Sequence, residues 1–205
     1  PVWLGDMPRR LFDGNSFPVA FSGLKANILS HMVQHGTIVT LGNPAKPVYV
    51  EAYYNNHPGG CLAYKVSADD TRFLFSGDHE ITDDIGVRQT TAAMLHDVDL
   101  AVVDASYSRQ DYHEGWGHST WEDWAEAAEK AGVATLMLSH HMQDRTDVEL
   151  DALQRLLLER KQKTNPDSPL QIVVAREGMR FSLPGLLDIE YKPSNWLQEF
   201  VDALS

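Results

Sequence analysis

The sequence predicts an α/β fold in which helices cover a sheet. From residue 83 onward, helical periodicity alternates with apolar runs of strand length, which is typical of layered α/β domains. Before residue 83, short runs rich in β-forming residues are separated by turn-forming residues, which indicates antiparallel hairpins. The 205 residues fit one large domain better than two small ones.

The first part of the chain is predicted to hold one helix and three strands. Residues 1–24 are rich in Pro and Gly and are expected to be irregular. Residues 25–35 are predicted to form a short helix that ends at Gly36, where a left-handed backbone is tolerated. The three strands are predicted over Val48–Tyr54, Cys61–Val66 and Arg72–Ser76.

Three helices are predicted further on, and two of them begin with a capping box. The first spans residues 83–96. Ser119-Thr120-Trp121-Glu122 has the pattern in which a hydroxyl and a Glu side chain satisfy the first backbone N–H groups of a helix. We expect this helix to end at Gly132. Thr146–Glu149 repeats the box and opens a helix to about Lys163, whose core-facing residues are predicted to be Leu150, Leu153, Leu157 and Leu158.

Three buried strands are predicted between and after these helices, over residues 99–104, 134–139 and 170–175. The last stretch, 194–204, carries its apolar residues on one helical face. It could pack on its own domain, on a second copy or lead into a further domain. We divide the chain into a main domain, 1–187, expected to be the C-terminal portion of a larger one, and an amphipathic helix or linker, 188–205.

Composition excludes several classes of protein. Cys61 is the only cysteine, so an internal disulfide and a thiolate metal cluster are excluded, and any metal must be held by nitrogen and oxygen. A formal net charge of -12 without a basic patch opposes binding to extended nucleic acid. No segment approaches the roughly 20 apolar residues of a membrane-spanning helix, and no signal peptide is evident. We expect a cytoplasmic enzyme with no membrane partner.

Three polar residues fall where predicted apolar strands end: His57, Asp78 and His140. In layered α/β proteins the ends of neighbouring strands lie side by side and ligands bind beyond them. Imidazole and carboxylate groups are ligands for zinc, manganese or iron, and a carboxylate can bridge two ions. Taken singly, a histidine at a strand end is more often a hydrogen-bonded core or rim residue than a ligand, and an Asp after Gly is usually part of a turn.

Five motifs occur in an order that resembles the metallo-β-lactamase-fold hydrolases. They are Asn56–Tyr64, Ser76–Glu80, Gly117–Thr120, Leu138–His141 and Ala175–Met179. The resemblance covers roughly residues 17–183 and is greatest to the branch that contains tRNA 3′-end processing endonucleases and cyclic-nucleotide or phosphonate-pathway phosphodiesterases. It implies an αββα sandwich, here incomplete at the N-terminus.

The resemblance also implies a two-metal site. In it His57 binds the first ion, Asp78 bridges both, and His140 binds the second, with His141 as the alternative to His140. The two divalent ions, zinc or else manganese or iron, would activate a hydroxide. His118 would donate a hydrogen bond or proton to the phosphoryl oxygen or the leaving group; its other reading is a residue that merely precedes a helix cap.

One departure from the family bears on this implied site. The family takes most of its seven ligands from an upstream His-x-His-x-Asp-His motif, and the 205 residues contain none. We expect the parent polypeptide to carry this motif before Pro1 and this chain alone to be inactive. The alternative is a degenerate, non-catalytic relative that serves as a sensory or interaction module.

Other polar and aromatic residues near these motifs have open roles. His79 and Glu80 could orient the ligands or make surface contacts, and Asp104 resembles a family carboxylate but could equally cap a turn. His31 and His35 share a helical face, which we interpret as solvated. Trp116, Trp121 and Trp124 could stack a nucleobase or pack in the core, and residues 107–117 form a candidate specificity loop.

The sequence thus favours a metal-dependent phosphodiesterase acting on a small nucleotide-like substrate. Its acidity argues against tRNA as that substrate. A lactone or thioester hydrolase of the same fold is the alternative enzyme. The sequence leaves the oligomeric state open; a homodimer is compatible with it, because symmetric dimers are common and the terminal helix offers a surface.

Overall fold

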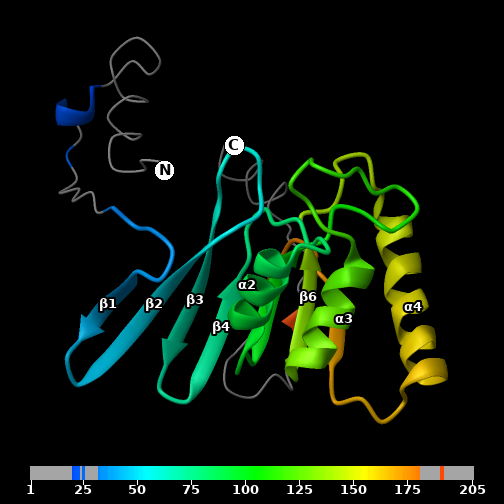
Figure 1. Ribbon diagram of the computed structural model, residues 1–205. Coiled ribbons are helices and arrows are strands. Elements are labelled where there is room, and N and C mark those ends of the chain that lie inside the picture. The colour runs from blue at the N-terminus through cyan, green and yellow to red at the C-terminus, as the bar shows by residue number, and fades with distance from the viewer. Residues whose placement is uncertain (1–19, 24, 26–31, 181–189, 192–205) are drawn as a thin grey trace, which may run out of the picture.

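The computed structural model of the chain describes residues 20–23, 25, 32–180 and 190–191 (Figure 1). The predicted helix over 194–204, the division at residue 187 and most of the predicted helix over 25–35 lie outside these residues. The described end of the latter, residues 32–35, is not helical and leads into a turn at Gly36, so the prediction is wrong there.

A mixed seven-stranded sheet forms the centre of the described fold, with its strands in sequence order from β1 to β7. The strands are β1 (Ile38–Asn43), β2 (Lys46–Tyr54), β3 (Leu62–Ala68), β4 (Thr71–Phe75), β5 (Leu100–Asp104), β6 (Thr135–Ser139) and β7 (Gln171–Val174). β1 to β4 pair antiparallel, and β4 to β7 pair parallel. The short strands β8 (Met179–Arg180) and β9 (Glu190–Tyr191) form a separate pair.

Six of the seven strands of this sheet agree with the sequence prediction, and β1 was missed. Ile38 and Leu41 of β1 are exposed, as is most of that strand. The strand is formed through antiparallel pairing with β2, in which Ile38 lies opposite Glu51 and Asn43 opposite Lys46. An edge strand that buries little apolar surface gives a weak pattern in the sequence.

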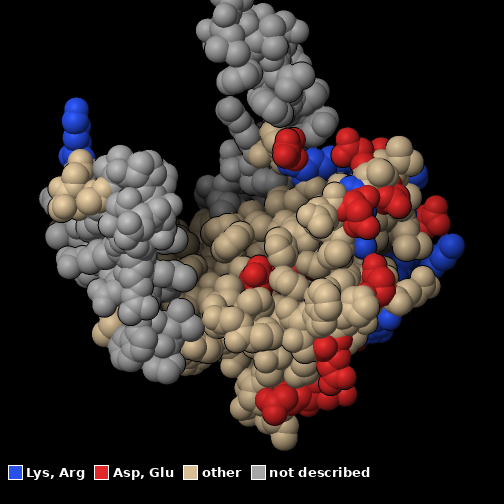
Figure 2. All heavy atoms as spheres, turned by 90° about the horizontal axis from the view of Figure 1, so that it is seen from above, with Lys and Arg blue, Asp and Glu red and all other residues tan. Residues whose placement is uncertain are grey.

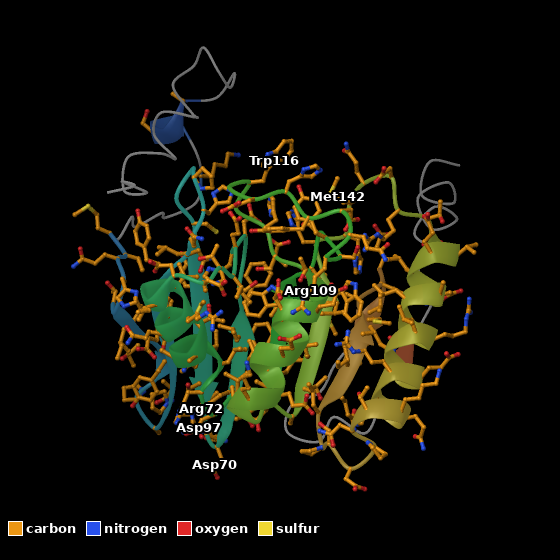
Figure 3. All side chains as sticks on the ribbon, turned by 45° about the vertical axis from the view of Figure 1, so that its right-hand side comes forward. Asp70, Arg72, Asp97, Arg109, Trp116 and Met142 are labelled. Carbon is orange, nitrogen blue, oxygen red and sulfur yellow. The ribbon has the colours of Figure 1, made fainter. Side chains whose placement is uncertain are left out.

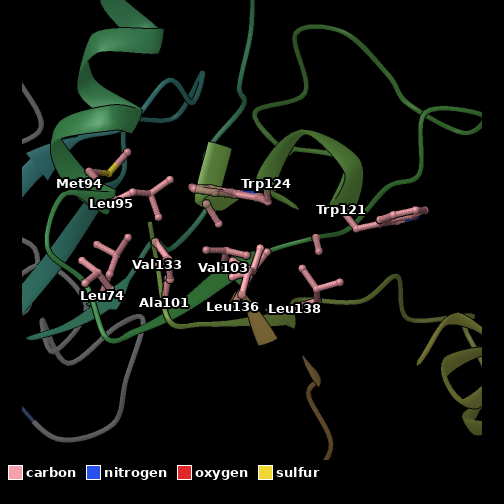
Figure 4. Close-up of a cluster of buried hydrophobic side chains, with 14 of the residues drawn as sticks. Leu74, Met94, Leu95, Ala101, Val103, Trp121, Trp124, Val133, Leu136 and Leu138 are labelled. Carbon is pink, nitrogen blue, oxygen red and sulfur yellow. The ribbon is translucent and has the colours of Figure 1, made fainter. Parts of the chain in front are cut away.

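Three helices lie over one face of the sheet: α2 (Ile85–Leu95), α3 (Trp121–Ala131) and α4 (Asp147–Thr164) (Figure 1). The core lies between this helix layer and the sheet (Figure 4). Its fully buried members include Leu74 and Leu136 from the sheet and Met94 and Trp124 from the helices. Burial of these side chains is the main favourable contribution to folding.

The two predicted capping boxes had different outcomes. At α4, Thr146 and Glu149 form the box as predicted. At α3 the N-cap is Thr120, whose side chain accepts a hydrogen bond from the Asp123 N–H. Ser119, the predicted cap, instead accepts a hydrogen bond from Ile81 N–H and donates one to the His79 carbonyl. The tertiary contact to residues 79–81 therefore takes the hydroxyl that the local pattern assigned to the helix.

The predicted core face of α4 is also partly wrong. Leu150 and Leu157 are buried and Leu153 packs against the core, but the Leu158 side chain is 58% exposed. One helical position is about 100° of rotation, so Leu158, next to Leu157, points away from the sheet.

Because β4, β5, β6 and β7 are parallel, their carboxyl ends meet at one edge of the sheet. Residues 32–180 supply one sheet and one helix layer of the expected sandwich, and the predicted α/β class is confirmed. Among the described residues, no helix has the length and apolar character needed to cross a membrane.

A candidate metal centre at the carboxyl ends of the strands

Four polar side chains predicted from the sequence meet at the carboxyl edge of the sheet: His57, Asp78, His118 and His140. Asp78 follows β4, His140 directly follows β6, His57 lies in the β2–β3 turn, and His118 precedes α3. Asp104, the last residue of β5, joins them. Ligand atoms of Asp78, Asp104, His118 and His140 all lie within 4.8 Å of one another.

Asp78 lies between two of the histidines, and each of its carboxylate oxygens faces a different ring. Oδ2 is 3.7 Å from His57 Nε2, and Oδ1 is 3.8 Å from His140 Nε2. The carboxylate therefore has the orientation of a group that bridges two positions. The sequence prediction gave Asp78 this role.

The donor set fits divalent ions of the zinc type. Two ligands of one tetrahedral zinc, with bonds of about 2.0–2.2 Å, are separated by roughly 3.3–3.6 Å. The separations of 3.7 and 3.8 Å on the two sides of Asp78 are only a few tenths of an ångström larger. Nitrogen and carboxylate oxygen are also the ligands that zinc, manganese and iron accept.

Asp104 is the buried anchor of this site. Its side chain is only 1% exposed. Oδ1 accepts hydrogen bonds from Ser106 Oγ at 2.6 Å and His140 Nδ1 at 3.1 Å, and Oδ2 accepts one from His118 Nδ1 at 2.7 Å. Burial alone would raise the pKa of Asp104, but the hydrogen bonds from His140, Ser106 and His118 outweigh it and hold the pKa below its ordinary value.

The bonds to Asp104 also fix which nitrogen of each ring faces the site. In His118 and His140, Nδ1–H donates to the carboxylate, so Nε2 is left with its lone pair in the neutral ring. Histidines that bind metals are commonly oriented by such a carboxylate. The hydrogen bond to Asp104 is the main reason that the pKa of His140 lies above its ordinary value. Burial alone would lower this pKa, and the nearby charges of Asp104 and Asp78 add to the rise.

His57 differs in the nitrogen that is free. Its Nδ1 accepts a hydrogen bond from the Gly59 N–H at 3.1 Å, so Nε2 carries the proton in the neutral ring. Binding a cation through Nε2 would require the ring to give up this hydrogen bond and hold its proton on Nδ1 instead. On its other side the ring packs closely against Gly117, where a Cβ would lie 2.2 Å from Cδ2.

A glycine and a buried asparagine shape the turn that presents Asp78. Gly77 has a φ of 59°, and a Cβ there would lie 3.0 Å from the Cys61 sulfur, so this turn favours glycine. Asn55 Nδ2 donates to the carbonyls of Ser76 and Asp78, at 2.6 and 2.7 Å. These bonds tie the end of β2 to the end of β4, and sequence patterns gave no sign of Asn55.

The structure places His140, not His141, beside Asp78. His140 has a left-handed φ of 55°, a conformation that costs non-glycine residues energy and is frequent at functional sites. The alternative ligand, His141, lies outside the cluster of Asp78, Asp104, His118 and His140. Its pKa is lowered by burial.

His79, Glu80 and His35 have structural roles. The fully buried His79 accepts a hydrogen bond from Asn56 N–H at Nδ1 and contacts Thr91 through Nε2 at 2.9 Å. Glu80 is 3% exposed and binds the 107–117 loop. His35 Nδ1 accepts the Tyr54 N–H, while His31 lies outside the described residues.

The three tryptophans around His118 are not equivalent. Trp124 is fully buried and its Nε1–H donates to the Asp104 carbonyl at 2.7 Å. Trp121 is buried beneath Arg160, whose guanidinium lies 5.4 Å from the ring centroid. Trp116 is exposed at the site end of the molecule (Figure 3). Only Trp116 of these three is therefore available to a ligand.

Comparison with known proteins identifies the family of the chain. The family described as the beta-lactamase superfamily domain matches residues 11–141, and the chain belongs to this family. Members are in general metal-dependent hydrolases. No curated protein matches the chain.

Solved structures share the fold at low sequence identity. The metallo-beta-lactamase fold protein YhfI from Bacillus subtilis is 16% identical with a TM-score of 0.58, over 83% of this chain and 60% of that one. Yeast PDE1 is 14% identical with a TM-score of 0.50, over 71% and 48%. The short form of human tRNase Z is 19% identical with a TM-score of 0.48, over 72% and 47%.

The chain thus spans about half to three fifths of the length of these three structures. The predicted resemblance to the metallo-β-lactamase fold is confirmed. A shared fold at this identity does not select a reaction or a substrate.

Proposed function

We propose that this chain supplies part of a two-metal centre that hydrolyses phosphodiester bonds in a small, nucleotide-like substrate. The observation that carries the proposal is the position of Asp78, whose two oxygens face His57 and His140 at 3.7 and 3.8 Å. A carboxylate shared in this way is how two ions are held close together.

Each residue has a definite part in this proposal. His57 would hold one ion, His140 the second, and Asp78 both. When bound, two divalent ions would supply a water of lowered pKa and neutralise charge on the phosphoryl oxygens. We assign zinc as the metal because the site offers only nitrogen and carboxylate oxygen, with manganese and iron as the alternatives.

His118 is the proposed proton donor. Its Nδ1–H is engaged by Asp104 at 2.7 Å, so Nε2 is the nitrogen left for the substrate. The buried carboxylate of Asp104 stabilises the ring when Nε2 also carries a proton, and in that form it can protonate a leaving oxygen. Asp104 fixes the ring and the tautomer and does not itself contact the substrate.

The charge of the surface supports a small substrate. The site end of the molecule, viewed in Figure 2, has no continuous patch of Lys and Arg among the coloured residues, and most of its basic atoms lie near Asp and Glu. A long polyanion such as tRNA would require many such contacts. A substrate the size of a mononucleotide has few phosphate charges, and the two proposed metal ions would be enough to neutralise them.

The test combines metal analysis with substrate choice. Purified protein, both as the 205 residues and as the full product of the gene, is loaded with zinc, manganese or iron and assayed on bis-p-nitrophenyl phosphate and on an acyl lactone. We expect the 205 residues to be inactive and the full product to bind two ions and cleave the phosphodiester. Cleavage of the lactone alone would favour the lactone or thioester hydrolase instead.

Variants make the metal measurement specific. Asp78→Asn and His140→Asn should each lower the bound metal, whereas His96→Ala, an exposed histidine in the α2–β5 connection, should leave it unchanged. A full product that binds no metal would favour the non-catalytic module. A homodimer and a cytoplasmic location remain part of the proposal, and size-exclusion chromatography tests the former.

A further inference from the structure

Trp116 is held in solvent at the mouth of the candidate site. Its side chain is 63% exposed, whereas Trp121 and Trp124 are buried. A large aromatic ring kept in water forgoes a favourable burial of apolar surface. Figure 3 shows Trp116 at the carboxyl edge of the sheet, at the opposite end of the molecule from Asp70 and Asp97.

The segment that carries Trp116 is anchored on both sides of the ring. The backbone N–H groups of Gly115 and Gly117 donate to the Glu80 carboxylate at 2.7 and 2.8 Å, and the Tyr112 hydroxyl donates to it at 2.5 Å. Glu80 itself is buried. Bonds to a buried charged acceptor are among the stronger hydrogen bonds, so the backbone on both sides of Trp116 is held in place.

Other rings support the indole from behind. The His113 ring lies 5.3 Å from the Trp116 ring at 32°, and the buried Tyr107 lies 5.6 Å from His113. Tyr107 in turn lies 6.3 Å from His118, a site residue. A rigid aromatic surface of this kind binds a planar group with little loss of side-chain entropy.

The distance between Trp116 and the site suits one substrate molecule. Gly117, the next residue, packs against the His57 ring, and consecutive Cα atoms are about 3.8 Å apart. The Trp116 Cα is therefore within about 8 Å of that ring. An organic substituent on a phosphoester bound between His57 and His140 would therefore be within reach of the segment that carries the indole.

We propose that Trp116, supported by His113, is a specificity subsite that stacks on a planar heteroaromatic group, such as a nucleobase, of the phosphoester substrate. This inference rests on the proposed function. Stacking on an aromatic side chain contributes about 5- to 100-fold in affinity per base. A nucleotide should therefore bind more tightly, by this factor, than the same sugar phosphate without its base.

The test compares AMP with ribose 5-phosphate as ligands of the metal-loaded full product, by isothermal titration calorimetry. We expect AMP to bind about 5- to 100-fold more tightly. Trp116→Ala should remove this preference and leave ribose 5-phosphate binding unchanged, while Trp116→Phe should retain most of it. Tyr49→Ala, which removes an exposed aromatic ring from the middle of β2, is the matched control and should retain the preference.

Four results would overturn the inference. Equal binding of both ligands to the unaltered protein, or an unchanged preference in Trp116→Ala, would remove the subsite and leave the proposed function intact. Tighter binding of phosphocholine than of AMP would show that the indole accepts a cation and not a base. Failure of both sugar phosphates to bind a metal-loaded protein would count against the proposed function as well.

Discussion

Replacing Gly117 by alanine tests whether the 107–117 loop positions the His57 ring. A Cβ at this residue would lie 2.2 Å from His57 Cδ2 and 2.8 Å from Pro58 Cδ. Unstrained carbon atoms approach to about 3.5–4.0 Å, so the ring must move by more than about 1 Å. Gly115→Ala is a matched control, because Gly115 has nearly the same φ, 80° against 85°, and nothing within 4 Å of its Cβ.

Both variants strain the backbone, but only Gly117→Ala also displaces the His57 ring. Alanine at a left-handed position costs about 1–2 kcal/mol, so both should lower the free energy of unfolding by at least this amount, and Gly117→Ala by more because of its clash with His57 and Pro58. A displacement of about 1 Å at a reacting site can cost about 100-fold in rate. We therefore expect Gly117→Ala to lose about 100-fold in kcat/KM and to bind zinc more weakly, and Gly115→Ala to keep both nearly unchanged.

The assay uses zinc competition with a chromogenic chelator, hydrolysis of bis-p-nitrophenyl phosphate, and urea unfolding for each variant. Equal zinc affinity and equal activity in the two variants would refute the positioning of His57 by Gly117. Equal losses of zinc affinity in both would instead attribute the effect to backbone strain.

Three further predictions concern the groups behind the site. Burial lowers the pKa of His79 to about 4, although the charges of Asp104 and Glu80 oppose this shift. Between pH 6.5 and 4 the unfolded chain therefore binds more protons than the folded protein. The free energy of unfolding should fall by up to about 3 kcal/mol as the pH drops through this range. Urea titrations at pH 7 and 5 should show a smaller fall in His79→Gln, and an equal fall would be contrary to this role. Asp104→Asn should lower kcat more than about tenfold, because His118 loses its charged partner, with KM nearly unchanged; a change in KM alone would argue for a binding role. Glu80→Gln should lower the free energy of unfolding by about 1–3 kcal/mol and speed proteolysis within residues 107–117, and an unchanged cleavage rate would contradict the anchoring of this loop.

The positions of six strands and the meeting of three site residues could be predicted from sequence, because apolar runs mark the strands and the site residues follow them. His57, Asp78 and His140 each follow an apolar run, and parallel strands bring such ends to one edge. The resemblance to a known family added His118.

Asp104 and Asn55 show what the sequence could not give. A carboxylate at the end of a strand can cap a turn or accept bonds from two histidines, and only the positions of His118 and His140 distinguish these. Asn55 acts through carbonyl groups more than 20 residues away. Ser119 and Thr120 both fit a helix cap locally, and the contact of Ser119 with residues 79–81 decided between them. Each of these is a tertiary effect without a local pattern.

Anomalous diffraction from zinc-loaded crystals of the full gene product measures the proposed bridging role of Asp78 most directly. We expect two zinc peaks about 3.5–4 Å apart, one bonded to His57 and Asp78 Oδ2 and the other to His140 and Asp78 Oδ1. A single zinc ion, or two ions of which neither touches Asp78, would contradict the two-metal centre.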